Sequence, residues 1–393
     1  MRKSGTDMTP LRRENARDHK RYLWILSTVA PGCALLPSQL VHLTGLALFW
    51  WIGPILVFVI IPVLDIAVGC DGISPRDEDY EALSNDRYYR WCTFLFLPMQ
   101  LVGLAIAGYM WSGSELTLVD KLGLTITLGI VSGIGINAAH ELGHRVENSE
   151  RWLAKIALAQ SGYGHFFVEH NRGHHVRVAT PEDPASARFG EPLWAFIPRS
   201  AVGGFRSALA LERERLSRKG KRWFSRDNQL LQAWSLSVVV FGAMILAFGP
   251  VVIPYLALQA VIGIGLLETV NYLEHYGLLR ARRDDGRYER CAPRHSWNSD
   301  RLVTNVFLLH LQRHSDHHAN PGRRYQTLRS SDEAPQLPFG YATMVLLAAV
   351  PPLWRAVMDP RLLAHYSGDT TLVNRKPRRS RTGSPGESGD ILV

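Results

Sequence analysis

Long apolar stretches alternate with charged ones along this chain of 393 residues. Six of the apolar stretches approach the roughly 20 residues that a helix needs to cross about 30 Å of hydrocarbon. They are residues 23–46, 48–68, 92–109, 122–139, 230–248 and 251–270. Short turns at Thr44-Gly45 and Gly249-Pro250 join the first and the last pair, which favours antiparallel helix hairpins. The pattern therefore predicts an all-α polytopic membrane protein with six transmembrane helices.

The basic residues are distributed unevenly around these predicted spans. Residues 1–22, 71–90, 140–228 and 276–393 contain 7, 3, 15 and 18 lysines and arginines, and Lys121 is the one that remains. The cytoplasmic loops of membrane proteins are enriched in these two residue types. We therefore predict that both termini and the loops 71–90 and 140–228 lie in the cytoplasm.

A seventh apolar stretch, Pro338–Trp354, is short and ends near Pro351 and Pro352. We expect it to pack against the protein or to insert halfway from the cytoplasmic side. Residues 1–369 are predicted to form a single membrane-embedded domain. Residues 370–393 are rich in Arg, Ser and Gly, which predicts a disordered basic tail. The four cysteines are scattered, so neither a disulfide framework nor a thiolate metal site is indicated.

Nine of the 15 histidines lie in four short runs near predicted helix ends on the cytoplasmic side. They are His140, His144, His170, His174, His175, His275, His314, His317 and His318. Residues three or four apart share one face of a helix, whereas the adjacent His174 and His175 point about 100° apart and could serve different ions. A tetrahedral zinc ion takes at most four protein ligands. Nine imidazoles therefore predict two metal ions, each with four or five nitrogen ligands.

The six other histidines call for a simpler interpretation. His19, His42, His295, His310 and His365 are isolated in the sequence, so ordinary polar roles are expected for them. His165 lies five residues before His170 and could be a hydrogen-bond partner of a metal ligand.

The first histidine run also fits a different kind of enzyme. His140-Glu141-Leu142-Gly143-His144 matches H-E-x-x-H, in which two histidines bind zinc and the glutamate is the general base of a metalloprotease. That interpretation leaves seven of the nine clustered histidines without a role. A metal transporter would carry its histidines within the spans, which is not where they lie.

Four segments of the chain closely resemble the signature boxes of the integral-membrane alkane 1-monooxygenases. They are "HELGH", "EHNRGHHVRVATPEDPASAR", "NYLEHYGLLR" and "LQRHSDHHANPGRRYQTLR", and the resemblance extends from about Tyr22 to Asp359. This family belongs to the histidine-rich membrane di-iron desaturases and hydroxylases. The resemblance implies that the nine histidines hold two iron ions in a cytoplasmic cap on the bacterial inner membrane. It also implies O₂-dependent hydroxylation of n-alkanes to primary alcohols. A zinc metalloprotease, a fatty-acyl desaturase and a xylene-type hydroxylase are the alternatives.

The resemblance also implies that electrons come from a separate rubredoxin, reduced by an NAD(P)H-dependent reductase. The chain has no C-x-x-C pair and no dinucleotide fingerprint of its own, and we expect no nucleic-acid partner. The basic segment 211–222, "LERERLSRKGKR", is a candidate docking face for an acidic carrier.

Two further sets of residues are candidates for supporting roles. Metal-bound histidines usually donate their second N–H to a carboxylate or carbonyl. The acidic residues in or beside the boxes are Glu141, Glu169, Glu182, Asp183, Glu274 and Asp316. An alkane would enter sideways from the bilayer, and the apolar residues proposed to line its slot are Val57, Phe58, Ile61, Leu128 and Ile134.

Overall fold

The computed structural model describes residues 18–113 and 115–376, and in these ranges all repetitive secondary structure is helical. Their extended backbone makes only three isolated bridges, so the predicted all-α class is confirmed. Residues 18–113 contain η1 (Arg21–Thr28), α1 (Val29–Leu35), α2 (Pro37–Thr44), η2 (Ala47–Trp51), α3 (Ile52–Ile55), η3 (Leu56–Ile60), α4 (Ile61–Val68), η4 (Asp77–Asp79), α5 (Tyr80–Asn85), α6 (Arg87–Phe94) and α7 (Phe96–Ser112).

The longest helices lie after residue 115. Residues 115–275 contain α8 (Leu118–Gly143), α9 (Asn148–Ala159), α10 (Phe166–Glu169), η5 (His170–His174), α11 (His175–Arg177), α12 (Leu193–Arg218), α13 (Gln229–Phe248), η6 (Pro250–Val252) and α14 (Ile253–His275). After these come η7 (Pro293–His295), α15 (Leu302–Phe307), α16 (His314–Ala319), η8 (Tyr325–Thr327), α17 (Tyr341–Ala348) and α18 (Pro351–His365).

Five of the described helical stretches are long and apolar enough to cross a membrane. They are Ala47–Val68, Arg87–Ser112, Leu118–Gly143, Gln229–Phe248 and Pro250–His275, and each contains one of the predicted spans. Arg87–Ser112, Leu118–Gly143 and Pro250–His275 extend several residues beyond the predicted spans. A helix can continue past the apolar stretch wherever polar residues follow without a helix-breaking residue. In α8 and α14 this extension carries the first histidine run and His275.

The first predicted span is not straight. Arg21–Leu35 and Pro37–Thr44 form two helices that meet at 65°. Pro37 has no N–H to donate, so the helical hydrogen-bond ladder is interrupted at this residue and the chain bends there, although Leu36 itself keeps helical backbone angles. The seventh apolar stretch is also broken, since α17 and α18 meet at 120° just before Pro351. This sharp break is consistent with a segment that packs without crossing in a straight line.

Helix α8 forms the centre of the molecule. It begins at a capping box, in which the Thr117 hydroxyl accepts a hydrogen bond from the Asp120 N–H and the Asp120 carboxylate accepts one from the Thr117 N–H. It packs most closely on α14, where Gly129 and Gly133 face it. A Cβ added at Gly129 would lie 2.6 Å from the Cβ of Ile262, so glycine is required for this approach.

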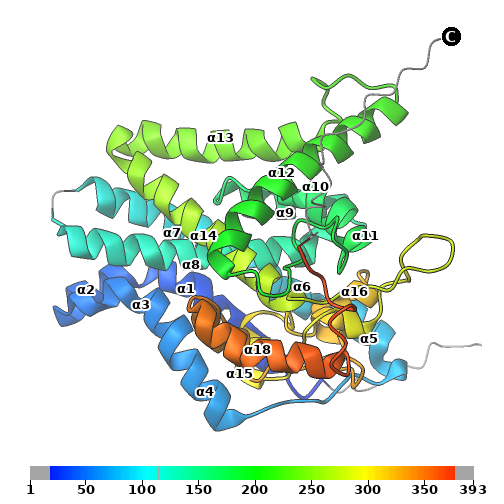
Figure 1. Cartoon of the computed structure of the whole chain (residues 1–393). Coiled ribbons are helices and arrows are strands. Elements are labelled where there is room, and N and C mark those ends of the chain that lie inside the picture. The colour runs from blue at the N-terminus through cyan, green and yellow to red at the C-terminus, as the bar shows by residue number, and fades with distance from the viewer. Residues whose placement is uncertain (1–17, 114, 377–393) are drawn as a thin grey trace, which may run out of the picture.

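Figure 1 shows α10, α11 and α16 at one end of the molecule, away from α2 and from the turn between α7 and α8. All the clustered histidines therefore lie at that end. The predicted tail begins there as well, but its first residues differ from the prediction. Val373 and Asn374 are buried, and the Asn374 carbonyl accepts a hydrogen bond from the Phe189 N–H at 2.7 Å. Packing of Val373 into the core explains this order. Residues 377–393 of the predicted tail lie outside the described range.

Candidate metal centre

Four helix ends bring the nine histidines together. His140 and His144 are one turn apart at the end of α8, and His275 is the last residue of α14. His170–His174 forms a single π-helical turn between α10 and α11, a local widening that is frequent at functional sites. His314, His317 and His318 lie on α16, a helix of only six residues.

The nine ring nitrogens separate into two compact groups. The first group is His140, His144, His170, His175 and His317, and the second is His174, His275, His314 and His318. Within each group all donor atoms lie within 4.8 Å of one another. The adjacent His174 and His175 fall into different groups, as their predicted directions required. The structure therefore brings together every histidine that the sequence singled out.

The facing atoms within each group are mostly Nε2 atoms at short distances. In the first group the Nε2 atoms of His140 and His317 are 2.8 Å apart, and those of His144 and His170 are 3.1 Å apart. In the second group His318 and His314 are 2.8 Å apart, and His314 and His275 are 3.2 Å apart.

A metal ion at the centre of each group accounts for this arrangement. A neutral imidazole has only one N–H, so five or four converging Nε2 atoms cannot satisfy each other by hydrogen bonds. Donors about 2.0–2.1 Å from a metal would be about 2.9 Å apart at right angles and about 3.4 Å apart in a tetrahedron. The observed separations of 2.8–3.2 Å are close to these values. The residues present therefore fit two metal ions, one with five histidine ligands and one with four.

The protonation of these rings agrees with metal binding. Burial lowers the pKa of His170, His175 and His317 well below the usual value, so these rings are neutral and keep a lone pair for a metal. Electrostatic repulsion from neighbouring histidines lowers the pKa of these three rings further.

Two of the predicted carboxylates contact the histidines. Asp183 Oδ2 lies 2.9 Å from His174 Nδ1 and accepts a hydrogen bond from the Ser186 hydroxyl at 2.6 Å. Burial alone would raise the pKa of Asp183, but His174 and Ser186 together hold it at about 2. Glu274 makes a different contact, since its Oε2 lies 3.1 Å from His314 Nε2, the nitrogen that faces the second group. Asp183 therefore orients a ring, whereas Glu274 lies at the edge of the donor set.

The other candidate carboxylates pair with arginines. Glu141 lies 2.9 Å from Arg145, and Glu169 lies 2.8 Å from Arg177. Asp316 lies 2.6 Å from Arg323, and Glu182 is an exposed residue 3.4 Å from Arg282. Among the isolated histidines, His310 has ordinary partners, because its Nδ1 lies 2.9 Å from the Tyr325 carbonyl.

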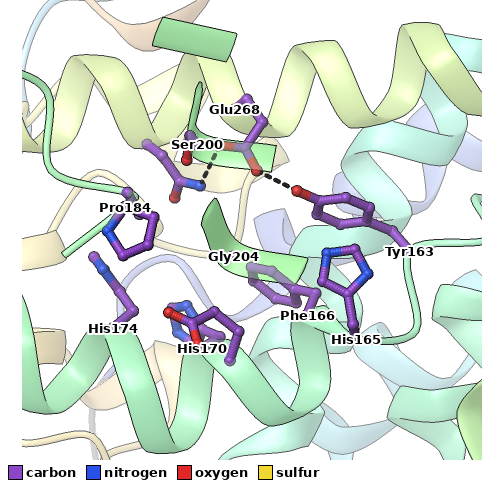
Figure 2. A pocket seen from close by; sticks show the side chains of 12 residues that line it. Tyr163, His165, Phe166, His170, His174, Pro184, Ser200, Gly204 and Glu268 are labelled. Atoms are coloured by element: carbon purple, nitrogen blue, oxygen red, sulfur yellow. Dashed lines mark hydrogen bonds between the residues drawn. The ribbon is translucent and has the colours of Figure 1, made fainter. Parts of the chain in front are cut away.

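A small cavity adjoins both groups at His170 and His174 (Figure 2). Glu268 projects toward it from α14 and accepts a hydrogen bond from the Tyr163 hydroxyl at 2.6 Å. His165 also lines this cavity, and burial lowers its pKa to about 4. Glu268 is not among the predicted site residues, although it is the only charged residue in the apolar stretch 251–270. An ionisable residue inside a span is a recognised signal of function.

An apolar pocket is lined by residues of α4, α8, α14, α15 and α17. Its empty volume is about 620 Å³, open mouth included, and its lining is almost entirely apolar. Val57, Ile61 and Ile134 line it as predicted, but Phe58 and Leu128 do not. Leu128 is instead fully buried in the helical core. Asn137 also lines the pocket, one turn of α8 before His140, and Leu311 precedes His314 by three residues. The pocket therefore reaches the metal-binding end of the helices.

A wide basic pocket opens on the other side of His144. The cations that line it are Arg145, Arg151, Arg172, Arg215 and Lys219. Arg215 and Lys219 belong to the predicted docking segment, whereas the three other arginines were not singled out by the sequence. His144 of the first group also lines this pocket, so the pocket reaches from the surface to a metal-binding residue.

Comparison with known proteins agrees with this geometry. Residues 121–348 match the fatty acid desaturase family. The chain is 46% identical over 370 residues to an alkane 1-monooxygenase of Acinetobacter baylyi, with 92% of this chain and 90% of the relative covered. It is 44% identical over 357 residues to an alkane 1-monooxygenase of Pseudomonas putida, and this alignment covers 91% of this chain and 89% of the relative. The hydroxylase component of a xylene/toluene monooxygenase of Pseudomonas putida is 28% identical over 80% of this chain and 83% of its own. The chain belongs to the alkane 1-monooxygenase family, within the wider fatty acid desaturase family.

Proposed function

We propose that the protein hydroxylates the terminal carbon of n-alkanes with O₂ at a di-iron centre, with electrons supplied by a separate rubredoxin. The observation that carries this proposal is the position of the apolar pocket. It ends one helical turn from His140, beside two histidine groups that each fit a metal ion. The alkane 1-monooxygenases named above support the substrate class and the use of O₂.

We assign the following roles to the residues of this chain. The five histidines of the first group hold one iron ion and the four of the second group hold the other. The iron ions supply the O₂ activation that attack on an unactivated C–H bond requires. Val57, Ile61 and Ile134 exclude water and hold the alkane with one end toward the histidines. Asp183 accepts the Nδ1–H of His174 and so keeps its Nε2 free for the metal.

The zinc protease alternative requires Glu141 to act as a base beside the metal. Instead, Glu141 is held by Arg145 and by the Tyr325 N–H at 3.3 Å. A zinc ion would also need to accommodate five histidines in the first group, which exceeds its tetrahedral preference. A xylene-type hydroxylase is an alternative outcome of the test, because the chain is also 28% identical to the hydroxylase component of a xylene/toluene monooxygenase.

We propose that six helices cross the bacterial inner membrane and that the histidine end faces the cytoplasm. The sorting of lysines and arginines between loops supports this orientation. The α17–α18 pair would then lie on the cytoplasmic side, because its 120° break prevents a straight crossing. Reporter fusions after Ser112 and after Lys376 test this topology. A periplasmic signal is expected for the first and a cytoplasmic signal for the second, and the reverse would contradict it.

The basic pocket beside His144 is the proposed docking site for the acidic electron carrier. Charge reversal at Lys219, which lines this pocket, should lower the association rate with reduced rubredoxin, and high salt should remove most of the difference. Lys221 is a matched control, because it is exposed on the same segment and does not line the pocket. Equal effects of Lys219→Glu and Lys221→Glu would contradict this location.

The test of the function as a whole combines metal analysis with turnover. The purified protein, supplied with reduced rubredoxin and a series of n-alkanes, should form primary alcohols. Formation of benzylic alcohols from xylene without any alkane product would favour the alternative substrate class. Peptide cleavage would contradict the proposal.

A further inference from the structure

Five oxidisable side chains form a buried cluster beside the metal-binding end of the molecule. Trp24 is in η1, Tyr88, Tyr89 and Cys92 are on α6, and Tyr325 begins η8. Trp24 is fully buried, and Tyr89, Cys92 and Tyr325 are almost fully buried. Ordinary packing explains the apolar contacts of such rings, but the order of the rings and their hydrogen bonds point to a further role.

The rings of this cluster form a continuous series toward the surface. The ring centroids of Trp24 and Tyr325 are 5.1 Å apart, those of Tyr325 and Tyr89 are 6.2 Å apart, and those of Tyr89 and Tyr88 are 5.5 Å apart. Tyr88 is in turn 6.5 Å from Tyr22, and Tyr22 is 79% exposed. Electrons can pass between aromatic side chains at such short separations.

The inner end of the series lies next to the metal-binding residues. The Tyr325 N–H donates a hydrogen bond to Glu141, the residue that follows His140. The Trp24 ring packs edge-on against His310 with centroids 4.6 Å apart, and His310 is four residues before His314. The series therefore starts between the segments that carry both histidine groups.

One carboxylate is placed to accept the protons that oxidation of these rings would release. Asp18 Oδ2 accepts hydrogen bonds from the Trp24 indole N–H at 2.7 Å and from the Tyr89 hydroxyl at 2.9 Å. The Arg21 guanidinium lies 5.4 Å from the centre of the Tyr89 ring, which disfavours positive charge on that ring. An oxidised Tyr89 must therefore lose its proton together with the electron, and Asp18 is the acceptor within hydrogen-bond reach.

We propose that Trp24, Tyr325, Tyr89, Tyr88 and Tyr22 form a path that removes oxidising equivalents from the metal centre when no alkane consumes them. The inference rests on the proposed function, because the oxidant is the one that O₂ generates there. For each equivalent, Tyr89 gives one electron inward and its phenolic proton to Asp18. Tyr22 then gives one electron through Tyr88 to Tyr89, which regains the proton from Asp18, and the exposed Tyr22 releases its own phenolic proton to solvent. A small-molecule thiol supplies a hydrogen atom to the Tyr22 radical, and two thiyl radicals combine to a disulfide.

The test compares Tyr89→Phe with Tyr255→Phe during O₂ consumption without alkane. Tyr89→Phe keeps the ring but removes the phenol from the middle of the path. Tyr255 is a matched control, since it is equally buried, stacks on Trp111 and donates to the Leu104 carbonyl away from the histidines. The readouts are tyrosyl and tryptophanyl radicals by electron paramagnetic resonance, and oxidised residues by mass spectrometry.

The wild type and Tyr255→Phe should show a tyrosyl radical and oxidation products at Tyr22 and Tyr88. In Tyr89→Phe the oxidised residues should instead be Tyr325 and Trp24. This variant should lose its activity severalfold faster than the wild type during O₂ consumption without alkane. Its initial rate of alkane hydroxylation should be unchanged. Identical radicals and lifetimes in both variants would overturn the inference while the hydroxylase function stands. A wild type that consumes no O₂ after iron loading would overturn both. Trp24→Phe provides a second variant in case Tyr89→Phe does not fold.

Discussion

Substitution of Asp183 by Asn tests how the protein orients its metal-binding histidines. The Asp183 carboxylate accepts three hydrogen bonds, from His174 Nδ1 at 2.9 Å, the Ser186 hydroxyl at 2.6 Å and the Ala185 N–H at 3.2 Å. Asparagine has nearly the same shape, but its NH₂ group would face one of these donors. The His174 ring would then lose the charged partner that fixes its tautomer.

The size of the effect follows from the contacts that are lost. A hydrogen bond to a charged group contributes about 1.5–3 kcal/mol. Changes of such outer partners typically cost roughly 10- to 100-fold in metal affinity or activity. That range corresponds to about 1.4–2.7 kcal/mol, since a factor of ten is about 1.36 kcal/mol. The two ranges overlap, so Asp183→Asn should lower the metal affinity of the group that contains His174 by roughly 10- to 100-fold. The fold should remain intact.

The assay measures the iron that each variant retains during dialysis against increasing chelator concentrations. Glu182→Gln is the matched control, because it makes the same chemical change at the neighbouring residue, which is exposed and contacts no histidine of the site. We expect Asp183→Asn to lose close to half of its iron at a chelator concentration that leaves Glu182→Gln loaded. Equal retention in the two variants would refute the orienting role of Asp183.

Three further predictions concern the helix end, the helix contact and the apolar pocket. Glu141→Gln should lower thermal stability, because it breaks a buried ion pair, but it should retain both metal ions and part of the hydroxylase activity. His144→Ala should lose metal. A Glu141→Gln protein with full iron and no activity would show that Glu141 takes part in the reaction and would contradict this prediction. Gly129→Ala should destabilise the protein by about 1–3 kcal/mol through overpacking, while Gly265→Ala, which meets nothing within 4 Å, should leave the unfolding midpoint almost unchanged. Ile134→Phe should shift the preferred alkane toward shorter chains in a product analysis, and an unchanged chain-length profile would remove Ile134 from the pocket.

The sequence predicted the long helices well, because a run of about 20 apolar residues has few other stable environments. It did not predict where α8 and α14 end, since helical hydrogen bonding continues into the polar residues that bind metal. The bend before Pro37 was readable from the proline, but its 65° angle depends on the neighbouring helices. Order at Val373 depends on a distant apolar surface, which composition alone does not reveal.

In the candidate metal centre too, features that depend on nearby residues could be predicted from the sequence, whereas features that depend on contacts between distant segments could not. The identity of the nine histidines and the different directions of His174 and His175 follow from spacing along a helix. Their division into five and four depends on how α16 meets the ends of α8 and α14, which the sequence does not encode locally. The basic pocket was partly missed for the same reason. Arg145, Arg151 and Arg172 are far from Lys219 in the sequence and converge only in the folded protein.

The central claim is that two groups of histidines each hold an iron ion. Quantitative metal analysis of the purified protein, of His144→Ala from the first group and of His275→Ala from the second, tests it most directly. We expect two iron ions per wild-type chain and close to one in each variant, with alkane hydroxylation lost in both. One zinc ion per wild-type chain, unaffected by His275→Ala, would contradict it.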